Sequence, residues 1–101
     1  MVILVPEDMQ EARIILDIFH PTRIKILRAI SNGANRVVDI AKKAEASTSS
    51  IYDALNTFRR YGLVSVEYEG ARPRYIATEQ AKRLVELYNE LIHELKDVVR
   101  E

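Results

Sequence analysis

Side chains that can hydrogen-bond a base edge or a phosphate gather between residues 47 and 75. Ile51, Leu55 and Phe58 recur at the spacing of one buried helix face. The other faces of this helix carry polar or charged groups, on Ser49, Ser50, Tyr52, Asp53, Asn56 and Arg60. Gly62 stands where a helix end needs a left-handed residue, and an arginine-bearing segment follows it. This layout is typical of a unit that reads DNA.

Five helices and one hairpin are expected from the apolar periodicity and the turn residues. The expected helices are 7–18, 21–30, 36–44, 48–61 and 79–101. The expected strands are 64–69 and 75–77, around a tip at 70–73. Asn35, Ser47 and Thr78 are expected to cap the third, fourth and last helices. The third and fourth helices, joined by a short turn, predict a helix-turn-helix.

The composition predicts one folded domain without thiol chemistry. Of the 101 residues, 48% are hydrophobic, which is enough for a modest core. The absence of cysteine excludes disulfides and zinc ribbons. The apolar opening MVILV is only five residues long, and no later run approaches a membrane span. We therefore expect a cytoplasmic protein without a membrane partner.

The net charge is zero, but the charges are unevenly distributed. Residues 31–75 contain seven basic and five acidic residues, whereas residues 76–101 contain four and six. The central, hydrogen-bonding region is therefore the more basic one.

The first and last predicted helices carry more apolar surface than one small domain usually covers. In the last helix, apolar residues follow a heptad-like spacing from Ala81 to Val99. We expect a homodimer, since surplus apolar helix surface needs a partner. The candidate interface residues are Ile15, Ile18, Leu84, Leu87, Tyr88, Leu91, Leu95 and Val98.

Three consecutive segments carry a family resemblance: HPTRIKILRAI, VVDIAKKAEASTSSIYDALNTFRRYGLV and EGARPRY. Together they resemble the winged helix-turn-helix of bacterial and archaeal transcription regulators. PTRIKIL and the chain length are similar to ArsR-type repressors, whereas SSIYDALNTFRRYGLV and EGARPRY look more like TrmB-type sugar regulators. The resemblance implies a mainly α fold with a small β-hairpin wing, in one domain over 1–101. Its parts would be an N-terminal helix in 1–18, a winged-helix core over 21–78 and a C-terminal dimerisation helix over 79–101.

The resemblance also implies which residues would contact double-stranded DNA. Helix 48–61 would enter the major groove, and the wing at 69–74 would contact phosphate or the minor groove. The candidate DNA-binding residues are Arg36, Ser47, Thr48, Ser49, Ser50, Tyr52, Asp53, Asn56, Arg59, Arg60, Arg72 and Arg74. Each also has an ordinary interpretation, because serines favour helix starts and surface arginines are often only solvated.

No catalytic, metal or cofactor site is predicted. Glu90, His93 and Asp97 could share a metal on the last helix, but a solvated acidic face with one histidine explains them more simply. Neither a G-x-S-x-G motif nor a Gly-rich phosphate loop occurs, so we do not expect an enzyme.

The sequence therefore predicts a sequence-specific DNA-binding transcription regulator that acts as a homodimer. Two alternatives stay open. One is a winged helix that contacts another protein in a transcription complex, which the neutral net charge favours. The other is a DNA-coating protein that tolerates any sequence.

Overall fold

The computed structural model describes residues 6–99. Its elements are α1 (Pro6–Ile18), α2 (Pro21–Ser31), α3 (Val37–Ala44), α4 (Thr48–Arg60), β1 (Val64–Glu69), β2 (Arg72–Ala77) and α5 (Glu79–Val99). The predicted order of five helices and a hairpin is confirmed, with most bounds within two residues. The second strand is longer than predicted, because it begins at Arg72 instead of Tyr75. The parts of the predicted domain at 1–5 and 100–101 lie outside the described residues.

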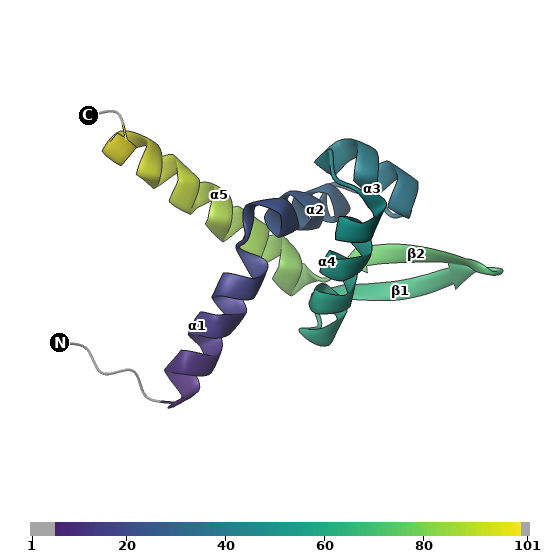
Figure 1. Cartoon of the computed structure of the whole chain (residues 1–101), viewed down its shortest axis with the longest axis horizontal. Coiled ribbons are helices and arrows are strands. Elements are labelled where there is room, and N and C mark those ends of the chain that lie inside the picture. The colour runs from purple at the N-terminus through teal and green to yellow at the C-terminus, as the bar shows by residue number, and fades with distance from the viewer. Residues whose placement is uncertain (1–5, 100–101) are drawn as a thin grey trace.

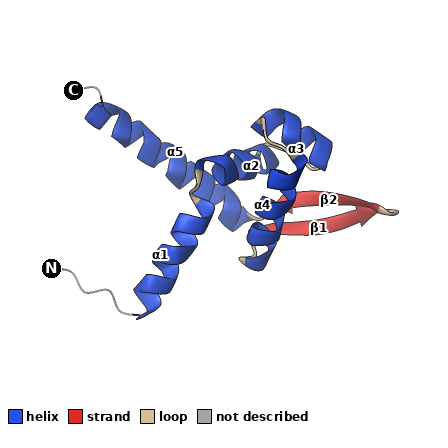
Figure 2. Cartoon of the chain, viewed as in Figure 1, coloured by secondary structure: helices blue, strands red, loops and turns tan. Residues whose placement is uncertain are grey.

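Helices α2, α3 and α4 and the hairpin pack into one body, from which α1 and α5 extend as two arms (Figure 1). Both arms leave the side of the body opposite the hairpin (Figure 2). The molecule is elongated, with principal extents of 54 × 35 × 24 Å. This is the winged helix-turn-helix that the sequence predicts. None of the described helices is long and apolar enough to cross a membrane.

The body has one apolar core, to which every element of the helix-turn-helix contributes. Leu27 of α2, Ile40 of α3, and Ile51 and Phe58 of α4 are fully buried in it. The face of α4 predicted from the apolar spacing is therefore the buried one. Burying each such side chain contributes about 1.5–3 kcal/mol, which fixes how α4 is rotated and which face it leaves to solvent.

Helix α4 begins and ends where its sequence predicts. The Ser47 hydroxyl accepts a 3.2 Å hydrogen bond from the Ser50 backbone N–H, as a helix cap does. At the other end Gly62 has φ +70°, and the Leu63 N–H donates to the Phe58 carbonyl at 2.8 Å. This 6→1 bond satisfies a carbonyl of the last turn and directs the chain into β1.

The predicted cap of α3 is wrong by one residue. Arg36 occupies the cap position and makes no side-chain cap bond. The Asn35 carbonyl instead accepts a 2.8 Å hydrogen bond from the Tyr75 N–H of β2. Because Asn35 pairs with the hairpin, the chain enters the helix only after Arg36, and the start of α3 is attached to the wing.

The two strands pair antiparallel, with Val64 opposite Ala77 and Glu69 opposite Arg72. The tip is the two-residue turn Gly70–Ala71, in which Gly70 has φ +63°. After β2, the Thr78 hydroxyl accepts a 3.3 Å hydrogen bond from the Ala81 N–H, which confirms the predicted cap of α5.

Candidate nucleic-acid interface

One continuous face of α4 is polar and open to solvent. It consists of Thr48, Ser49, Tyr52, Asp53, Asn56, Arg59 and Arg60, all exposed. At 100° per residue these positions fall within about 140° of the helix circumference. The face therefore offers hydroxyl, carboxylate, amide and guanidinium groups side by side along the helix.

Two of the predicted contact residues are already engaged at the start of α4. The Ser47 hydroxyl donates to the Ser50 hydroxyl at 2.9 Å, besides accepting the Ser50 N–H. Ser50 is half-buried, unlike its neighbour Ser49. For Ser47 and Ser50 the structure therefore gives a capping role.

The wing projects beyond the body and carries exposed side chains on both strands. Arg72, next to the tip, is exposed and has no ion pair with any residue from 9 to 99. Tyr68 is 68% exposed, although it alternates along β1 with Val64 and Val66, which are buried and half-buried. Sequence reasoning missed Tyr68 as a candidate contact. Its place two residues before Gly70 was the available signal, because side chains near a hairpin tip lie past the body that would cover them.

The exposed face of α4 and the wing border a shared groove of roughly 630 Å³. Its lining comes from α3, α4 and the hairpin: Arg36, Val37, Val38, Asp39, Tyr52, Ala71, Arg72 and Pro73. Nearby, burial raises the pKa of Tyr75, with further raising from Tyr52 and Tyr68 and lowering from Arg59.

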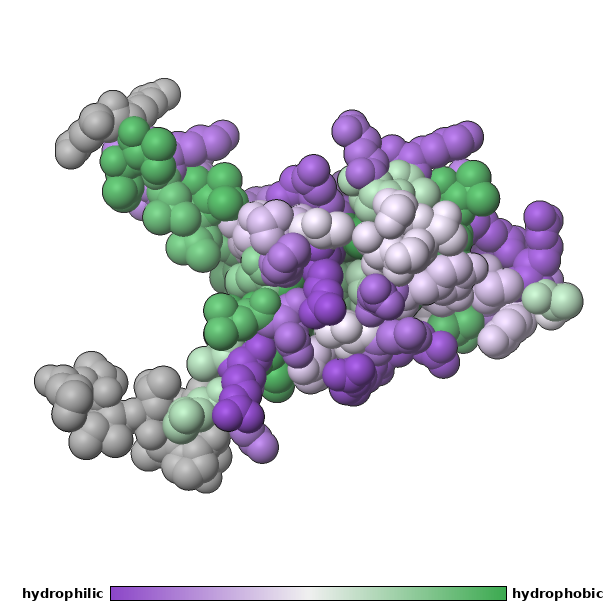
Figure 3. Space-filling view, in the orientation of Figure 1, coloured by the Kyte–Doolittle hydropathy of each residue, from purple (hydrophilic) through white to green (hydrophobic). Residues whose placement is uncertain are grey.

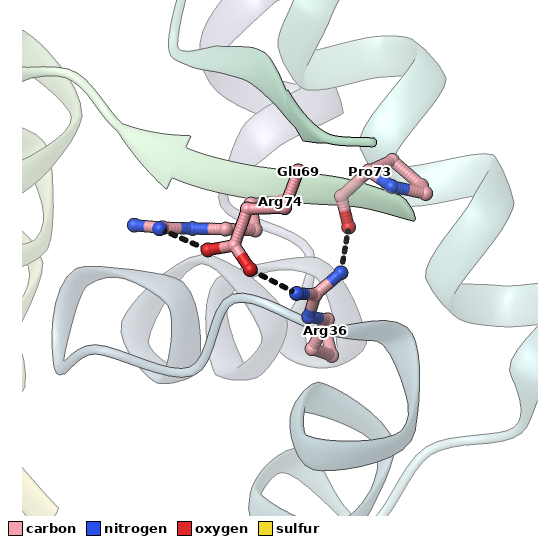
Figure 4. A network of polar contacts seen from close by, with 4 residues as sticks. All are labelled: Arg36, Glu69, Pro73 and Arg74. Atoms are coloured by element: carbon pink, nitrogen blue, oxygen red, sulfur yellow. Dashed lines mark hydrogen bonds and ion pairs between the residues drawn. The ribbon is translucent and has the colours of Figure 1, made fainter. Parts of the chain in front are cut away.

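A three-residue ion-pair network ties the wing to the start of α3 (Figure 4). Glu69 Oε1 lies 2.5 Å from Arg74 Nη1, and Glu69 Oε2 lies 3.0 Å from Arg36 Nη2. Arg36 Nη1 also donates to the Pro73 carbonyl at 3.2 Å. The hydrogen bond from Arg74, and secondarily the charges of both arginines, hold the pKa of Glu69 below its usual value. Two predicted DNA contacts, Arg36 and Arg74, thus share one carboxylate within the chain.

The arms expose most of the apolar residues predicted for a dimer interface. Ile15 of α1 is exposed, as are Leu87, Leu91, Leu95 and Val98 of α5. Apolar side chains gather along the outer part of α5 (Figure 3). Every α5 residue from 89 to 99 is exposed, although Asn89, the first of them, still accepts a 2.8 Å hydrogen bond from Arg28 of α2.

Three predicted interface residues lie nearer the body. Leu84 and Tyr88 are half-buried, and the Tyr88 ring meets the Phe19 ring edge-on at 5.5 Å between centroids. Ile18 is only 3% exposed and belongs to the core, so its predicted place at a dimer interface has to be corrected. The physical reason is that the end of α1 packs on the body, while Ile15, one turn earlier, does not.

Among the residues that the structure describes, no three His, Asp or Glu side chains are grouped as a metal site requires. Glu90, His93 and Asp97 all lie on the exposed part of α5.

Comparison with known proteins agrees with this geometry. Residues 20–66 match the model of the bacterial regulatory protein, arsR family. This segment contains the helix-turn-helix and the first half of β1. The matched family model is one of bacterial regulatory proteins rather than of enzymes. No protein with curated annotation matches the sequence.

Several solved structures share the fold along nearly the whole chain. M. tuberculosis Rv0081 has a TM-score of 0.78 at 24% identity, over 95% of this chain and 99% of that one. NolR from Sinorhizobium fredii has a TM-score of 0.71 at 24% identity, over 90% and 96%. The winged helix-turn-helix DNA-binding domain of Mb0332 from Mycobacterium bovis, a possible ArsR-family regulator described as homodimeric, has a TM-score of 0.72 at 24% identity, over 96% and 94%.

Proposed function

We propose that the chain is a sequence-specific transcription regulator that binds DNA as a homodimer, because its winged helix-turn-helix matches the arsR-family model over residues 20–66. Helix α4 enters the major groove, and the wing contacts the adjacent backbone or minor groove. Each protomer reads one half-site, and the arms α1 and α5 set the distance between the two.

The observation that carries this proposal is the exposed face of α4. A helix whose buried face is fixed by Ile51, Leu55 and Phe58 presents Tyr52, Asn56 and their polar neighbours in one orientation. Such side chains can bond base edges, and asparagine can pair with adenine through both its donor and its acceptor. Arg59 and Arg60 at the end of this face, and Arg72 on the wing, are exposed and suit phosphate contacts.

The homodimer is supported by the apolar surface of the arms. Leu91 and Leu95 are about half exposed on a helix stretch that nothing else in the described chain covers. An apolar stripe of this length is costly to leave in water and is typical of a subunit contact. The homodimeric state described for the M. bovis domain, which has the same fold, agrees with this proposal.

A salt-dependent DNA titration tests the proposal. We expect the wild-type protein to bind random duplex with an affinity that falls steeply as salt rises, since phosphate contacts release counterions. Arg72→Ala should weaken binding and reduce the salt slope by about one unit. The matched control is Arg83→Ala, which removes the same charge from exposed α5 and should bind like the wild type.

Selection from randomised duplexes then distinguishes a sequence-specific regulator from a DNA-coating protein. Enrichment of a two-fold symmetric sequence supports a regulator with two half-sites. Binding without any enrichment would instead identify a DNA-coating protein. If the wild type fails to bind at low salt, the proposal is wrong, and the neutral net charge would favour a protein-contact module.

A further inference from the structure

The carboxylate of Glu69 sits between two guanidinium groups that come from different elements. Arg74 belongs to β2, whereas Arg36 stands at the start of α3. The pairs are open to solvent, since the Glu69 side chain is 55% exposed. The two positive guanidinium groups therefore form an anion site, and the Glu69 carboxylate occupies it (Figure 4).

The site does not depend on a carboxylate in particular. A guanidinium presents donors that fit carboxylate and phosphate oxygens equally well. Arg36 is also held by its bond to the Pro73 carbonyl, so it stays near the wing when Glu69 moves.

The net charge of Arg36, Arg74 and Glu69 still favours the approach of a second anion. The two arginines and Glu69 together carry one net positive charge, which the Glu67 carboxylate opposite Arg74 partly offsets. Exposed ion pairs contribute little to stability, so a phosphate on a polyanion can displace the carboxylate at low cost. Arg36 also lines the groove that contains Tyr52 of α4 and Arg72 of the wing. The cluster thus borders the surface that the proposed function assigns to DNA.

We propose that Arg36 and Arg74 form a binding site for a DNA backbone phosphate, which the Glu69 carboxylate occupies while the protein is free. The inference rests on the proposed function. Glu69 acts as an internal competitor: it keeps the two arginines together near the wing and lowers their affinity for any duplex. On binding, a phosphodiester takes its place between the guanidinium groups.

Glu69→Gln tests this competition, and the neighbouring Glu67 supplies a matched control. Glu67 lies on the same strand, opposite Arg74, and makes no ion pair among residues 9–99. Glu67→Gln therefore removes the same charge from the same strand, close to Arg74, without breaking an ion pair of Arg36 or Arg74. Binding of both variants and the wild type to random duplex is measured across a salt series, with thermal unfolding as a check of folding.

We expect Glu69→Gln to bind up to about fivefold tighter than Glu67→Gln, the range for losing one exposed ion pair. Its salt slope should be steeper by about 0.9, the contribution of one more phosphate contact. In the Glu69→Gln background, Arg74→Ala should abolish the gain in DNA affinity. In the wild-type background, the same substitution should reduce the affinity by less. Such non-additivity is the mark of two groups that compete for one partner.

The outcomes separate this inference from the proposed function. Wild-type binding with no difference between the two glutamine variants overturns the competition and leaves the function standing. Weaker binding by Glu69→Gln also overturns it, because Glu69 would then position the wing instead of competing with DNA. If Arg74→Ala reduces DNA affinity equally in the wild-type and Glu69→Gln backgrounds, the competition is overturned, even if Glu69→Gln is poorly folded. No binding by the wild type would remove the proposed function itself.

Discussion

The Tyr61 hydroxyl donates a 2.7 Å hydrogen bond to Asp17 Oδ2, and this bond joins the end of α4 to the end of α1. Tyr61 is the residue that caps α4, and Asp17 lies in the last turn of the N-terminal arm. Arg23 of α2 donates to the Asp17 carbonyl at 2.9 Å, so the same junction also includes the start of the body. The helix proposed to read DNA and the arm proposed to dimerise are thus joined directly.

The stabilising effect of the bond between Tyr61 and Asp17 should depend on pH, and removal of the Tyr61 hydroxyl tests this. The hydrogen bond to Asp17, with burial and the Asp17 charge as lesser causes, raises the pKa of Tyr61 above its ordinary value. A raised pKa in the folded state means that the bond stabilises the protein below pH about 10 and is lost as the pH rises through the folded-state pKa. We expect Tyr61→Phe to unfold at lower urea concentration than the wild type at pH 7, and the difference to shrink at strongly alkaline pH.

Tyr68→Phe is the control for this comparison. It also removes a phenol hydroxyl, but Tyr68 is exposed on the wing and its hydroxyl has no hydrogen-bond partner among the described side chains. Its urea midpoint should stay close to that of the wild type. Equal midpoints for Tyr61→Phe and Tyr68→Phe at pH 7 would show that the bond to Asp17 does not stabilise the fold.

A charge in the apolar stripe of α5 should separate the proposed dimer. Leu91 is 50% exposed near the start of the exposed stretch 89–99 of α5. In Leu91→Glu, two carboxylates would be buried in a symmetric contact without partners, which is strongly unfavourable. We expect the dimer to weaken at least a hundredfold, equivalent to about 2.8 kcal/mol, as measured by sedimentation equilibrium.

His93→Glu places the same side chain on the opposite face of α5 and should leave the dimer intact. Helical unfolding of both variants, followed by circular dichroism, distinguishes dissociation from loss of structure. A wild-type chain that sediments as a monomer would refute the proposed dimer, and equal weakening by both variants would refute the assigned interface.

The helices could be predicted from the sequence because their signals are local. Ser47 caps α4 and Gly62 ends it through bonds to residues at most five positions away. The buried face at Ile51, Leu55 and Phe58 follows from periodicity alone. Element order and the position of the exposed α4 face therefore needed no knowledge of tertiary packing.

The details that escaped prediction depend on contacts between distant segments. The partner of Arg74 was not predictable, since the wing's register places Glu67 opposite it while the ion pair forms with Glu69. The burial of Ile18 depends on how the end of α1 meets the body, which apolar content does not encode. The cap of α3 was misplaced because Asn35 pairs with Tyr75, forty residues later.

Asn56 should determine sequence preference at a single base position. It lies on the exposed face of α4, between Tyr52 and Arg59, each about one turn away, and its amide makes no hydrogen bond within the described chain. An asparagine amide can donate to and accept from adenine in the major groove, and each such pair contributes about 1–3 kcal/mol of discrimination. In Asn56→Ala, selection from randomised duplexes should lose preference at one position of each half-site, while affinity for random duplex and its salt slope stay unchanged. Thr48→Ala, at the edge of the same face, is the control for a general change in the helix surface. If Asn56→Ala selects the same sequences as the wild type, the base reading must come from other side chains of α4, with Tyr52 and Ser49 the next to test.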